Sequence, residues 1–194
     1  MKNGNLFVIT GPSGVGKGTV LKRVLAELDQ IYYSVSATTR APREGEVHGV
    51  NYLFVTKEEF QTWIDQGRML EHACYVNNYY GTPEVPVQEH LDRGEDVILE
   101  IELQGALNVK AKRPDAVTVF IAPPSMSELE SRLRGRGTEN EETIAKRMNT
   151  ARTECAAVNE FRYVVVNDDL DKAVDDLKSI IKACRCINDG HVIE

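Results

Sequence analysis

The chain has 194 residues, of which 42% are hydrophobic and 27% charged, and its formal net charge is −7. This length and composition are typical of one globular domain with a buried core and exclude a disordered protein. The negative balance disfavours a nucleic-acid-binding protein, which needs a basic surface, and the apolar stretches are too short to span a bilayer. We therefore expect a protein that binds neither nucleic acid nor membrane.

The cysteines and the first residues of the chain indicate in which compartment the protein is found. Four cysteines in a chain of this size do not make a disulfide framework, and no apolar leader precedes the first predicted strand. We therefore expect a cytoplasmic protein with reduced thiols. Cys184, Cys186 and His191 have a faint likeness to a metal site, but a structural zinc needs four well-spaced ligands, so we predict no protein metal site.

The chain begins with a strand, a glycine-rich loop and a helix. A short apolar run, residues 6–9, is bounded by Gly and Pro and is typical of a strand buried in a parallel sheet. After Lys17, apolar residues recur at helical spacing, namely Leu21, Val24, Leu25 and Leu28. This order is the context in which a phosphate-binding loop is found.

The loop itself reads GPSGVGKGT and has the spacing G-x-x-x-x-G-K. Its glycines let backbone N–H groups approach a phosphate, Lys17 supplies a positive charge, and the following helix directs its positive dipole end at the anion. Gly18 stands where this pattern has the Ser or Thr that ligates Mg²⁺, so we expect Mg²⁺ to be bound mainly through phosphate oxygens and water. The predicted nucleoside-triphosphate ligands are Gly11, Pro12, Ser13, Gly14, Val15, Gly16, Lys17, Gly18 and Thr19.

Between about residues 37 and 93 the pattern changes to short strand-like pieces with Gly and Pro, which indicates an insertion. A small helix in it starts after Thr56, whose side chain can cap the helix while Glu59 closes the capping box. Arg40 and Arg43 lie three residues apart in a polar, turn-rich segment. Because guanidinium groups bind phosphate oxygens in pairs, these arginines are candidates for holding a nucleotide monophosphate.

The second half of the chain alternates strands and helices. Buried strands are predicted at residues 97–101, 117–121 and 163–166, and each is followed by a stretch of helical periodicity. This alternation predicts an α/β fold with a parallel sheet flanked by helices.

Two capping boxes and a lid are predicted in the same half. Ser125 with Glu128, and Thr138 with Glu141, have the spacing of capping boxes. Glycines alternate with arginines over residues 132–138. This pattern is typical of a hinged lid that brings positive charge to a phosphoryl group and excludes water as it closes.

Eight motifs follow one another along the chain: GPSGVGKGT, SVSATTRAPREGE, VNYLFV, NYYGTP, EIELQGA, FIAPPS, RLRGRGTE and VVVNDDLDKA. Taken together, they resemble the motifs of the guanylate kinases, and the resemblance runs from Gly4 to about Cys184. The resemblance implies one domain, residues 1–194, with a P-loop core, a small mixed α+β insertion that binds GMP and a short helical lid. The implied core is residues 4–36, 94–130 and 155–190, the insertion is 37–93 and the lid region is 131–154.

The resemblance also implies an activity. The protein would transfer the γ-phosphoryl group of ATP to GMP, and to dGMP, giving ADP and GDP in purine nucleotide metabolism. The acceptor is already an anion, so neither a general base nor a covalent intermediate is needed. Two other interpretations stay open: a non-catalytic guanylate-kinase-like module that binds other proteins, and a kinase of a different nucleoside monophosphate.

The GMP site implied by the resemblance has phosphate ligands and guanine ligands. Guanine presents its N1–H and 2-amino donors beside an O6 acceptor, so a carboxylate with nearby hydroxyls distinguishes it from adenine. The resemblance assigns the phosphate to Arg40, Arg43, Tyr52 and Tyr80. It assigns the guanine to Ser36, Glu71, Thr82 and Glu102. It also places Glu100, at the same strand end, in the GMP site, and the alternative role for Glu100 is to reach Mg²⁺ through water. Without the resemblance, Glu71 would be an ordinary surface acid.

The ATP site gains residues from the lid and from a late turn. The resemblance implies that Lys17, Arg40, Arg136 and Arg147 are the catalytic residues. It adds Arg132, Arg136 and Asn167 to the ATP ligands. The turn at Asn167 has a second interpretation, because Asp168 or Asp169 can cap the helix that follows it. We interpret Arg134 as a residue that complements a helix C-terminus.

Overall fold

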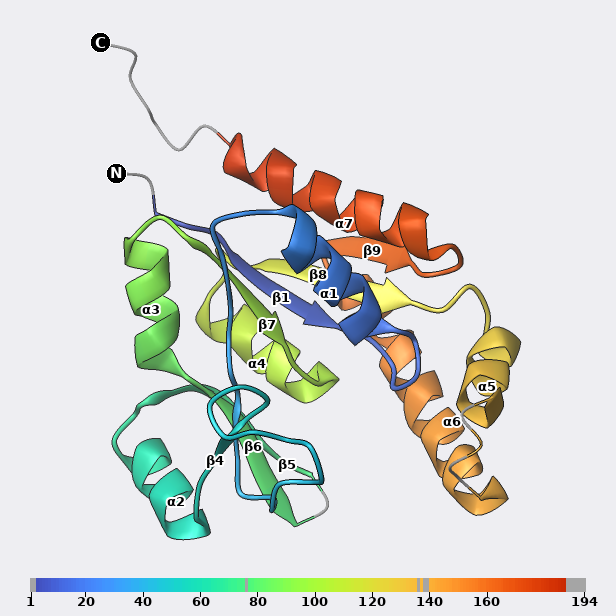
Figure 1. Ribbon diagram of the computed structural model, residues 1–194, viewed down its shortest axis with the longest axis horizontal. Helices are drawn as coiled ribbons and strands as arrows, with labels where there is room; N and C mark the ends of the chain where they lie inside the picture. Colours follow the sequence, from blue (N-terminus) through green and yellow to red (C-terminus); the bar gives the residue numbers. More distant parts are fainter. Residues whose placement is uncertain (1–2, 76, 136, 138–139, 188–194) are drawn as a thin grey trace. The chain divides into compact units, whose positions relative to one another are not determined.

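The computed structural model describes residues 3–75, 77–135, 137 and 140–187 (Figure 1). It contains two compact units. The first comprises Met1–Thr10 and Gln30–Thr118, and the second comprises Gly11–Asp29 and Val119–Glu194. The glycine-rich loop therefore belongs to the second unit, whereas the strand that precedes it belongs to the first.

The first unit contains three parallel strands in the order β2-β7-β1. Every residue of β1 is buried, as expected for an apolar strand whose two faces are covered. In the pairing of β1 with β7, Leu6 lies opposite Val97 and Ile9 lies opposite Glu100, which is the last residue of β7. Helix α3 packs against β7, and helix α4 packs against β1. The bounds are β1 Leu6–Thr10, β2 Ile31–Tyr33, α3 Glu84–Asp92, β7 Asp96–Glu100 and α4 Leu103–Lys112.

A second, smaller sheet in the first unit has the order β4-β3-β6-β5. It is mixed, because β3 pairs with β4 in parallel and with β6 in antiparallel orientation. Its core contains Ala37, Phe60 and Met69. Both halves of the predicted capping box are present at Thr56, where the helix begins. The bounds are β3 Ala37–Thr38, β4 Leu53–Phe54, α2 Lys57–Asp65, β5 Met69–Tyr75 and β6 Asn78–Pro83.

The second unit contains two parallel strands and most of the helices. Strands β8 and β9 pair with Val119 opposite Tyr163. Helix α5 is preceded by Ser125, whose hydroxyl accepts a hydrogen bond from the backbone of Glu128. The bounds are α1 Lys17–Glu27, β8 Val117–Ala122, α5 Met126–Gly135, α6 Glu141–Ala156, η1 Val158–Glu160, β9 Tyr163–Val166 and α7 Leu170–Arg185.

Helix α6 corrects one expectation. The helix begins at Glu141, and its N-cap is Asn140, whose side chain accepts a hydrogen bond from the backbone of Thr143. Glu141 is therefore the first residue of the helix and cannot be the third, so the capping box predicted for Thr138 and Glu141 is wrong. An Asn directly before the helix is as good a cap as a Thr. Thr138 itself lies outside the described residues.

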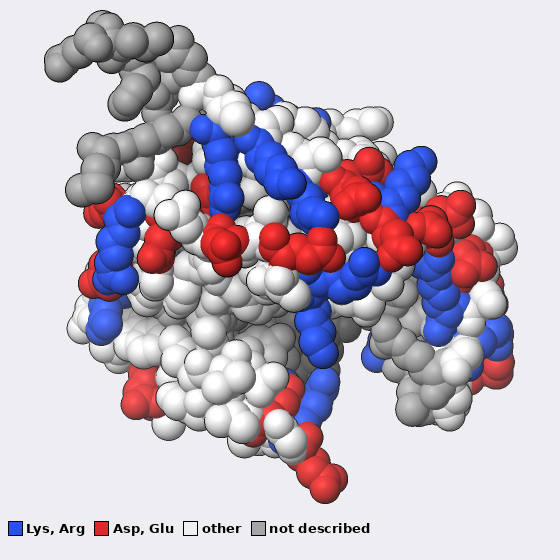
Figure 2. Space-filling view, turned by 45° about the horizontal axis from the view of Figure 1, so that its top comes forward, with Lys and Arg blue, Asp and Glu red and all other residues white. Residues whose placement is uncertain are grey.

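These elements confirm the predicted fold class. Parallel strands and helices alternate along the chain outside residues 37–83, and the small mixed sheet lies inside that segment. In the described part of the chain, no helix is both long enough and apolar enough to cross a membrane. On the face shown in Figure 2, basic and acidic side chains alternate, and neither sign covers that face alone.

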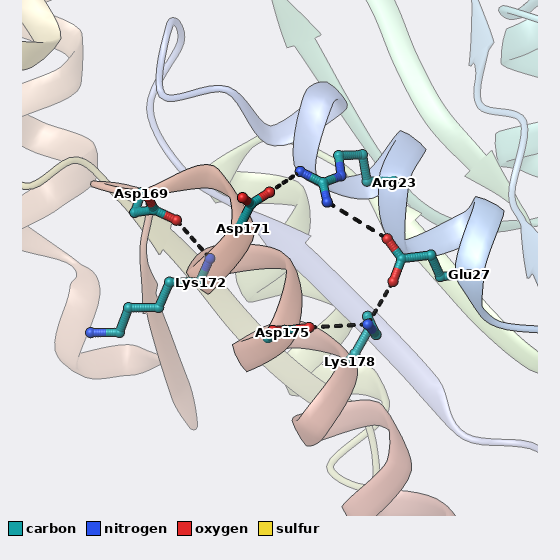
Figure 3. A network of polar contacts seen from close by, with 7 residues as sticks. All are labelled: Arg23, Glu27, Asp169, Asp171, Lys172, Asp175 and Lys178. Carbon is teal, nitrogen blue, oxygen red and sulfur yellow. Dashed lines mark hydrogen bonds and ion pairs between the residues drawn. The ribbon is translucent and has the colours of Figure 1, made fainter.

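A chain of ion pairs joins α1 to α7 within the second unit (Figure 3). Arg23 contacts Asp171 and also Glu27, and Glu27 in turn accepts from the ammonium of Lys178 at 2.6 Å. Lys178 also pairs with Asp175 at 3.0 Å. The carboxylates of Asp171 and Asp175 are 78% and 74% exposed. Because exposed ion pairs contribute little in water, we expect apolar packing to be what joins these helices.

We predict that Leu177→Ala lowers the free energy of unfolding by about 2–5 kcal/mol, because it leaves a cavity on the buried face of α7. Leu177 is 0% exposed in the structure. Lys178→Ala should shift the denaturation midpoint only slightly. Equilibrium urea denaturation of the two variants measures the comparison. A larger loss for Lys178→Ala would show that the ion pairs, and not the apolar contact, join α1 to α7.

Candidate active site

The glycine-rich loop has a backbone that only glycine allows at two of its positions. Gly14 has φ +91° and Gly16 has φ +95°, both in the left-handed region. A β-carbon at Gly14 would lie 2.7 Å from Leu133, and one at Gly16 would lie 2.7 Å from the amide nitrogen of Asn167. The loop is therefore held close to α5 and to the turn after β9, with no room for side chains in between.

Lys17 and the start of α1 supply positive charge to this loop. The ammonium of Lys17 donates to the carbonyl oxygens of Gly11 at 2.6 Å and of Pro12 at 3.3 Å. The N-cap of α1 is Gly16, so no side chain caps this helix, and its first turn contains no acidic residue. The N–H groups at this helix end can therefore meet an anion.

The remaining loop residues differ in exposure. Ser13, Gly18 and Thr19 are exposed, whereas Gly11, Pro12 and Val15 are buried. Among the described residues, and apart from its chain neighbours and the backbone of its own helix, nothing lies within 4 Å of where a β-carbon of Gly18 would be. The open space at position 18 means that packing does not require this glycine, and Thr19, the next residue, is exposed.

Two of the predicted lid arginines contact the loop or its support. Arg147 donates from Nη1 to the hydroxyl of Ser13 at 3.2 Å. Arg132 donates from Nη1 to the carbonyl of Asn167 at 2.9 Å and from Nε to Glu128 at 2.9 Å. The structure thus brings Arg132, Arg147 and Asn167 to the loop. Arg136, the third predicted lid arginine, lies outside the described residues.

Asn167 has a structural contact that the sequence pattern did not indicate. Its side chain is 6% exposed, and Nδ2 donates to the carbonyl of Val15 at 2.7 Å. Its own backbone N–H donates to Ala122 at 2.9 Å. The helix that follows is capped by Asp169, whose carboxylate accepts from the backbone of Lys172. Asn167 therefore stabilises the loop through its side-chain amide, while Asp169 caps α7.

Arg134 forms ion pairs away from the loop. It contacts Glu130 at 2.8 Å and also contacts Glu141. These pairs connect Arg134 to its own helix, α5, and to the first residue of α6.

A second group of predicted residues gathers in the first unit around Arg40. Its guanidinium carbon lies 5.5 Å from the ring centre of Tyr52, and the Tyr52 and Tyr80 rings are 6.1 Å apart. Arg40 also forms a bidentate ion pair with Glu46, with both N–O distances 2.9 Å. Arg43 is exposed, and its backbone N–H donates to Glu46 at 2.7 Å. Arg40, Tyr52 and Tyr80 thus form one cluster, and Arg43 lies beside it in the chain.

Glu71 is a buried acid rather than a surface acid. Its side chain lies on β5 and is 4% exposed, and it accepts a hydrogen bond from Thr82 on β6 at 2.8 Å. Burial raises the pKa of the Glu71 carboxyl to about 7, and the charge of Glu102 adds to the rise against the opposing Thr82 bond. The Lys112 ammonium donates to the Leu70 carbonyl at 2.8 Å, joining the end of α4 to β5.

The other two predicted acids are each held by a neighbour. Glu102 is the N-cap of α4, and its carboxylate accepts from the backbones of Gln104 at 2.8 Å and Gly105 at 2.5 Å. Glu100 accepts a hydrogen bond from the hydroxyl of Tyr33 at 2.7 Å. Because a carboxylate has about four acceptor positions, both can still accept from a ligand.

Ser36, the remaining predicted residue, is half-buried in the segment between β2 and β3. Its backbone carbonyl accepts from Leu53, the first residue of β4. Among the described residues, its side chain forms no hydrogen bond with Glu71 or Thr82.

Tyr33, Glu46 and Gly105 are site neighbours that the sequence analysis assigned to no role. Tyr33 and Glu46 contact predicted ligands directly through the bonds described above. A β-carbon at Gly105 would lie 2.6 Å from Oε2 of Glu71 and 3.3 Å from Oε1 of Glu102. Glu46 ends the motif that contains Arg40, and Gly105 lies in the motif EIELQGA that contains Glu100 and Glu102, so this proximity was a usable signal for both. Tyr33 had none.

Comparisons with known proteins extend this picture to the whole chain. The profile of the guanylate kinase family matches residues 3–184. The chain belongs to the guanylate kinase family. Guanylate kinases from Desulfitobacterium hafniense and Synechocystis are 54% and 53% identical to it, covering 95% and 92% of the chain and 92% and 93% of those proteins. The crystal structure of guanylate kinase from Anaplasma phagocytophilum has a TM-score of 0.76 at 32% identity, covering 96% of this chain and 89% of that one.

The buried Glu71 gives a prediction about pH. Its folded-state pKa of about 7 lies above the 4.5 of a free Glu, so burial costs nothing below pH 4.5, and stability is lost as the pH rises through 7. At pH 8, Glu71→Gln should therefore be more stable than the wild type by about 3 kcal/mol, and at pH 4.5 nearly equal. Urea denaturation at both pH values measures this difference. An equal difference at both would contradict the raised pKa.

A prediction follows from the close approach at Gly105. In a free helix, Gly105→Ala would add about 1 kcal/mol of helix stability. Here we expect it to displace Glu71 and to weaken GMP binding by about tenfold, because a displaced acceptor leaves donors unpaired. Calorimetric titration with GMP measures the change. Asn108→Ala, in the same helix, is the control and should bind GMP as the wild type does.

Proposed function

We propose that this protein is an ATP:GMP phosphotransferase, with ATP held by the glycine-rich loop and GMP held by residues of the insertion. The observation that carries the proposal is the buried Glu71–Thr82 pair, 4% and 0% exposed, in a chain of the guanylate kinase family. A buried acid beside a hydroxyl suits the adjacent donors of a guanine edge. The 54% identity to a protein named guanylate kinase supports the same activity.

The proposed donor site is carried by the second unit. The loop amides and Lys17 hold the β- and γ-phosphates of ATP, and Lys17 leaves its carbonyl partners for a phosphate oxygen. Arg132 and Arg147 approach the loop from α5 and α6. We assign them, with Arg136, to the charge that develops on the transferred phosphoryl group, and residues 131–154 to a lid. Asn167 acts here by holding the loop.

The proposed acceptor site is carried by the first unit. Arg40, Arg43, Tyr52 and Tyr80 hold the GMP phosphate, because all four donate to anionic oxygen. Ionised Glu71 accepts from N1–H and the 2-amino group. We assign the Ser36 and Thr82 hydroxyls to O6 and N7 of the guanine, and Glu102 to a second hydrogen-bond donor of the base. Glu100, the last residue of β7, is also assigned to the GMP site. An adenine would leave the buried Glu71 without a partner, so AMP should be rejected.

Chemistry at the proposed site needs few protein groups. An oxygen of the GMP phosphate forms a bond to the γ-phosphorus as the bond from that phosphorus to the β–γ bridging oxygen breaks, and ADP leaves with the electron pair. The attacking oxygen is already an anion, so no residue has to remove a proton. Lys17 and the arginines contribute by positioning and by charge neutralisation.

We propose Mg²⁺ as the cofactor, bound through phosphate oxygens and water. In the residues that the structure describes, no group of three or more His, Cys, Asp or Glu side chains could hold a metal ion. Gly18 offers no side-chain ligand, and Thr19 offers an accessible hydroxyl. This donor set fits an ion that keeps most of its waters, and such an ion supplies neutralising charge to the triphosphate. We also propose a cytoplasmic location and a role in purine metabolism.

A panel of acceptors tests the substrate. Steady-state phosphorylation of GMP, dGMP, AMP, UMP and dTMP with ATP should show turnover of GMP and dGMP. Turnover of another monophosphate in preference to GMP would replace the proposed substrate. No turnover with any of the five would favour the non-catalytic module.

Lys17→Ala tests the donor half. We expect kcat to fall by about 100-fold or more, because the lysine neutralises charge in the transition state, while the circular dichroism spectrum is unchanged. Lys22→Ala is the control, since Lys22 is an exposed lysine of the same helix. Near-normal turnover by Lys17→Ala would exclude this mechanism.

A further inference from the structure

We propose that Glu46 is a positioning residue, which holds the guanidinium of Arg40 in the orientation that binds the acceptor phosphate. This inference rests on the proposed function, because it concerns the same acceptor site. In this proposal, Glu46 does not contact GMP. It acts through Arg40.

The Arg40–Glu46 pair is specific in geometry and shielded from solvent. Nη1 of Arg40 donates to Oε2 of Glu46 and Nη2 donates to Oε1, both at 2.9 Å. The two side chains are 15% and 18% exposed, unlike the ion pairs of α1 and α7. A paired, bidentate arrangement fixes the plane of the guanidinium as well as its place.

Glu46 is itself held by the backbone of its own turn. Its Oε2 also accepts from the backbone N–H of Arg43 at 2.7 Å, and its backbone N–H donates to the carbonyl of Arg43 at 3.1 Å. Gly45, just before it, has φ +83°, which turns the chain back. The position of the carboxylate is therefore set independently of Arg40, as a positioning group requires.

The pair leaves one edge of Arg40 for a ligand. A guanidinium has two edges that can bind an oxyanion in bidentate fashion: the terminal edge, Nη1 with Nη2, and the side edge, Nε with Nη2. Glu46 takes the terminal edge, and Nη1 also donates to the carbonyl of Ala41 at 2.7 Å. Glu46, and after it Tyr80, hold the pKa of Arg40 above its usual value, so Tyr80 lies near the guanidinium. None of the hydrogen bonds described for Arg40 uses Nε, so we assign the side edge to the phosphate.

A competing role for Glu46 predicts the opposite sign. A carboxylate on a guanidinium resembles a phosphate, so Glu46 as a competitor would have to be displaced by GMP. Removing it would then strengthen GMP binding. Removing a positioning residue weakens GMP binding. The sign of the change therefore decides between the two roles.

The test compares Glu46→Gln with Glu44→Gln. Both remove one negative charge from the same turn, but Glu44 is exposed and belongs to no described ion pair. We expect Glu46→Gln to raise the KM for GMP by about tenfold, the order of one lost charge-assisted hydrogen bond, with the KM for ATP and the melting temperature unchanged. Glu44→Gln should leave both KM values unchanged. Glu46→Asp, which keeps the carboxylate, should recover part of the loss.

Each other outcome would overturn the proposal. A lower KM for GMP in Glu46→Gln would make Glu46 a competitor, and an unchanged KM would give it no role. Equal losses for GMP, ATP and melting temperature, in Glu46→Asp as well, would make its role purely structural. Calorimetric binding of GMP to the same variants is measured in parallel. If the wild type binds GMP without phosphorylating it, the proposed function fails while the binding data still decide the role of Glu46.

Discussion

The proposed donor site depends on a loop whose backbone can face a phosphate with no β-carbon in the way. Gly14 and Gly16 meet this requirement with positive φ angles, and their neighbours come within 2.7 Å of where side chains would begin. One of these neighbours, Asn167, also holds the Val15 carbonyl through its amide. Helix α5 and the turn after β9 thus pack closely against the loop. This packing holds the loop in a conformation whose N–H groups can bind an anion.

In the acceptor half, the corresponding constraint is the desolvation of Glu71. The carboxyl is buried with Thr82 as its hydroxyl partner, and Gly105 leaves the space that both it and Glu102 need. Burial raises the pKa of Glu71 to about 7, so ionising this carboxyl in the ligand-free protein costs folding free energy. In the proposed site, a guanine edge would bring two donors to this acid and offset that cost, whereas an adenine edge would not. Under the proposed function, selectivity for guanine and reduced stability without ligand would therefore have one cause.

The sequence predicted the elements better than the contacts. Strands such as Leu6–Thr10 and the P-loop were predictable because local periodicity and glycine spacing determine them. The candidate residues came mainly from the family resemblance, and their roles stay predictions. The amide of Asn167 on Val15, 152 positions away, and the hydroxyl of Tyr33 on Glu100 could not be predicted, because no local pattern links residues that only the fold brings together.

The two nucleotide sites should be separable by mutation, because each proposed set of ligands lies in one compact unit. Isothermal titration calorimetry with a non-hydrolysable ATP analogue and, separately, with GMP tests this directly. Lys17→Ala should weaken binding of the ATP analogue by about tenfold or more and leave GMP binding unchanged. Glu71→Gln should weaken GMP binding by about tenfold or more and leave binding of the ATP analogue unchanged. Equal weakening of both nucleotides by either variant, or unchanged GMP binding by Glu71→Gln, would contradict two separate sites.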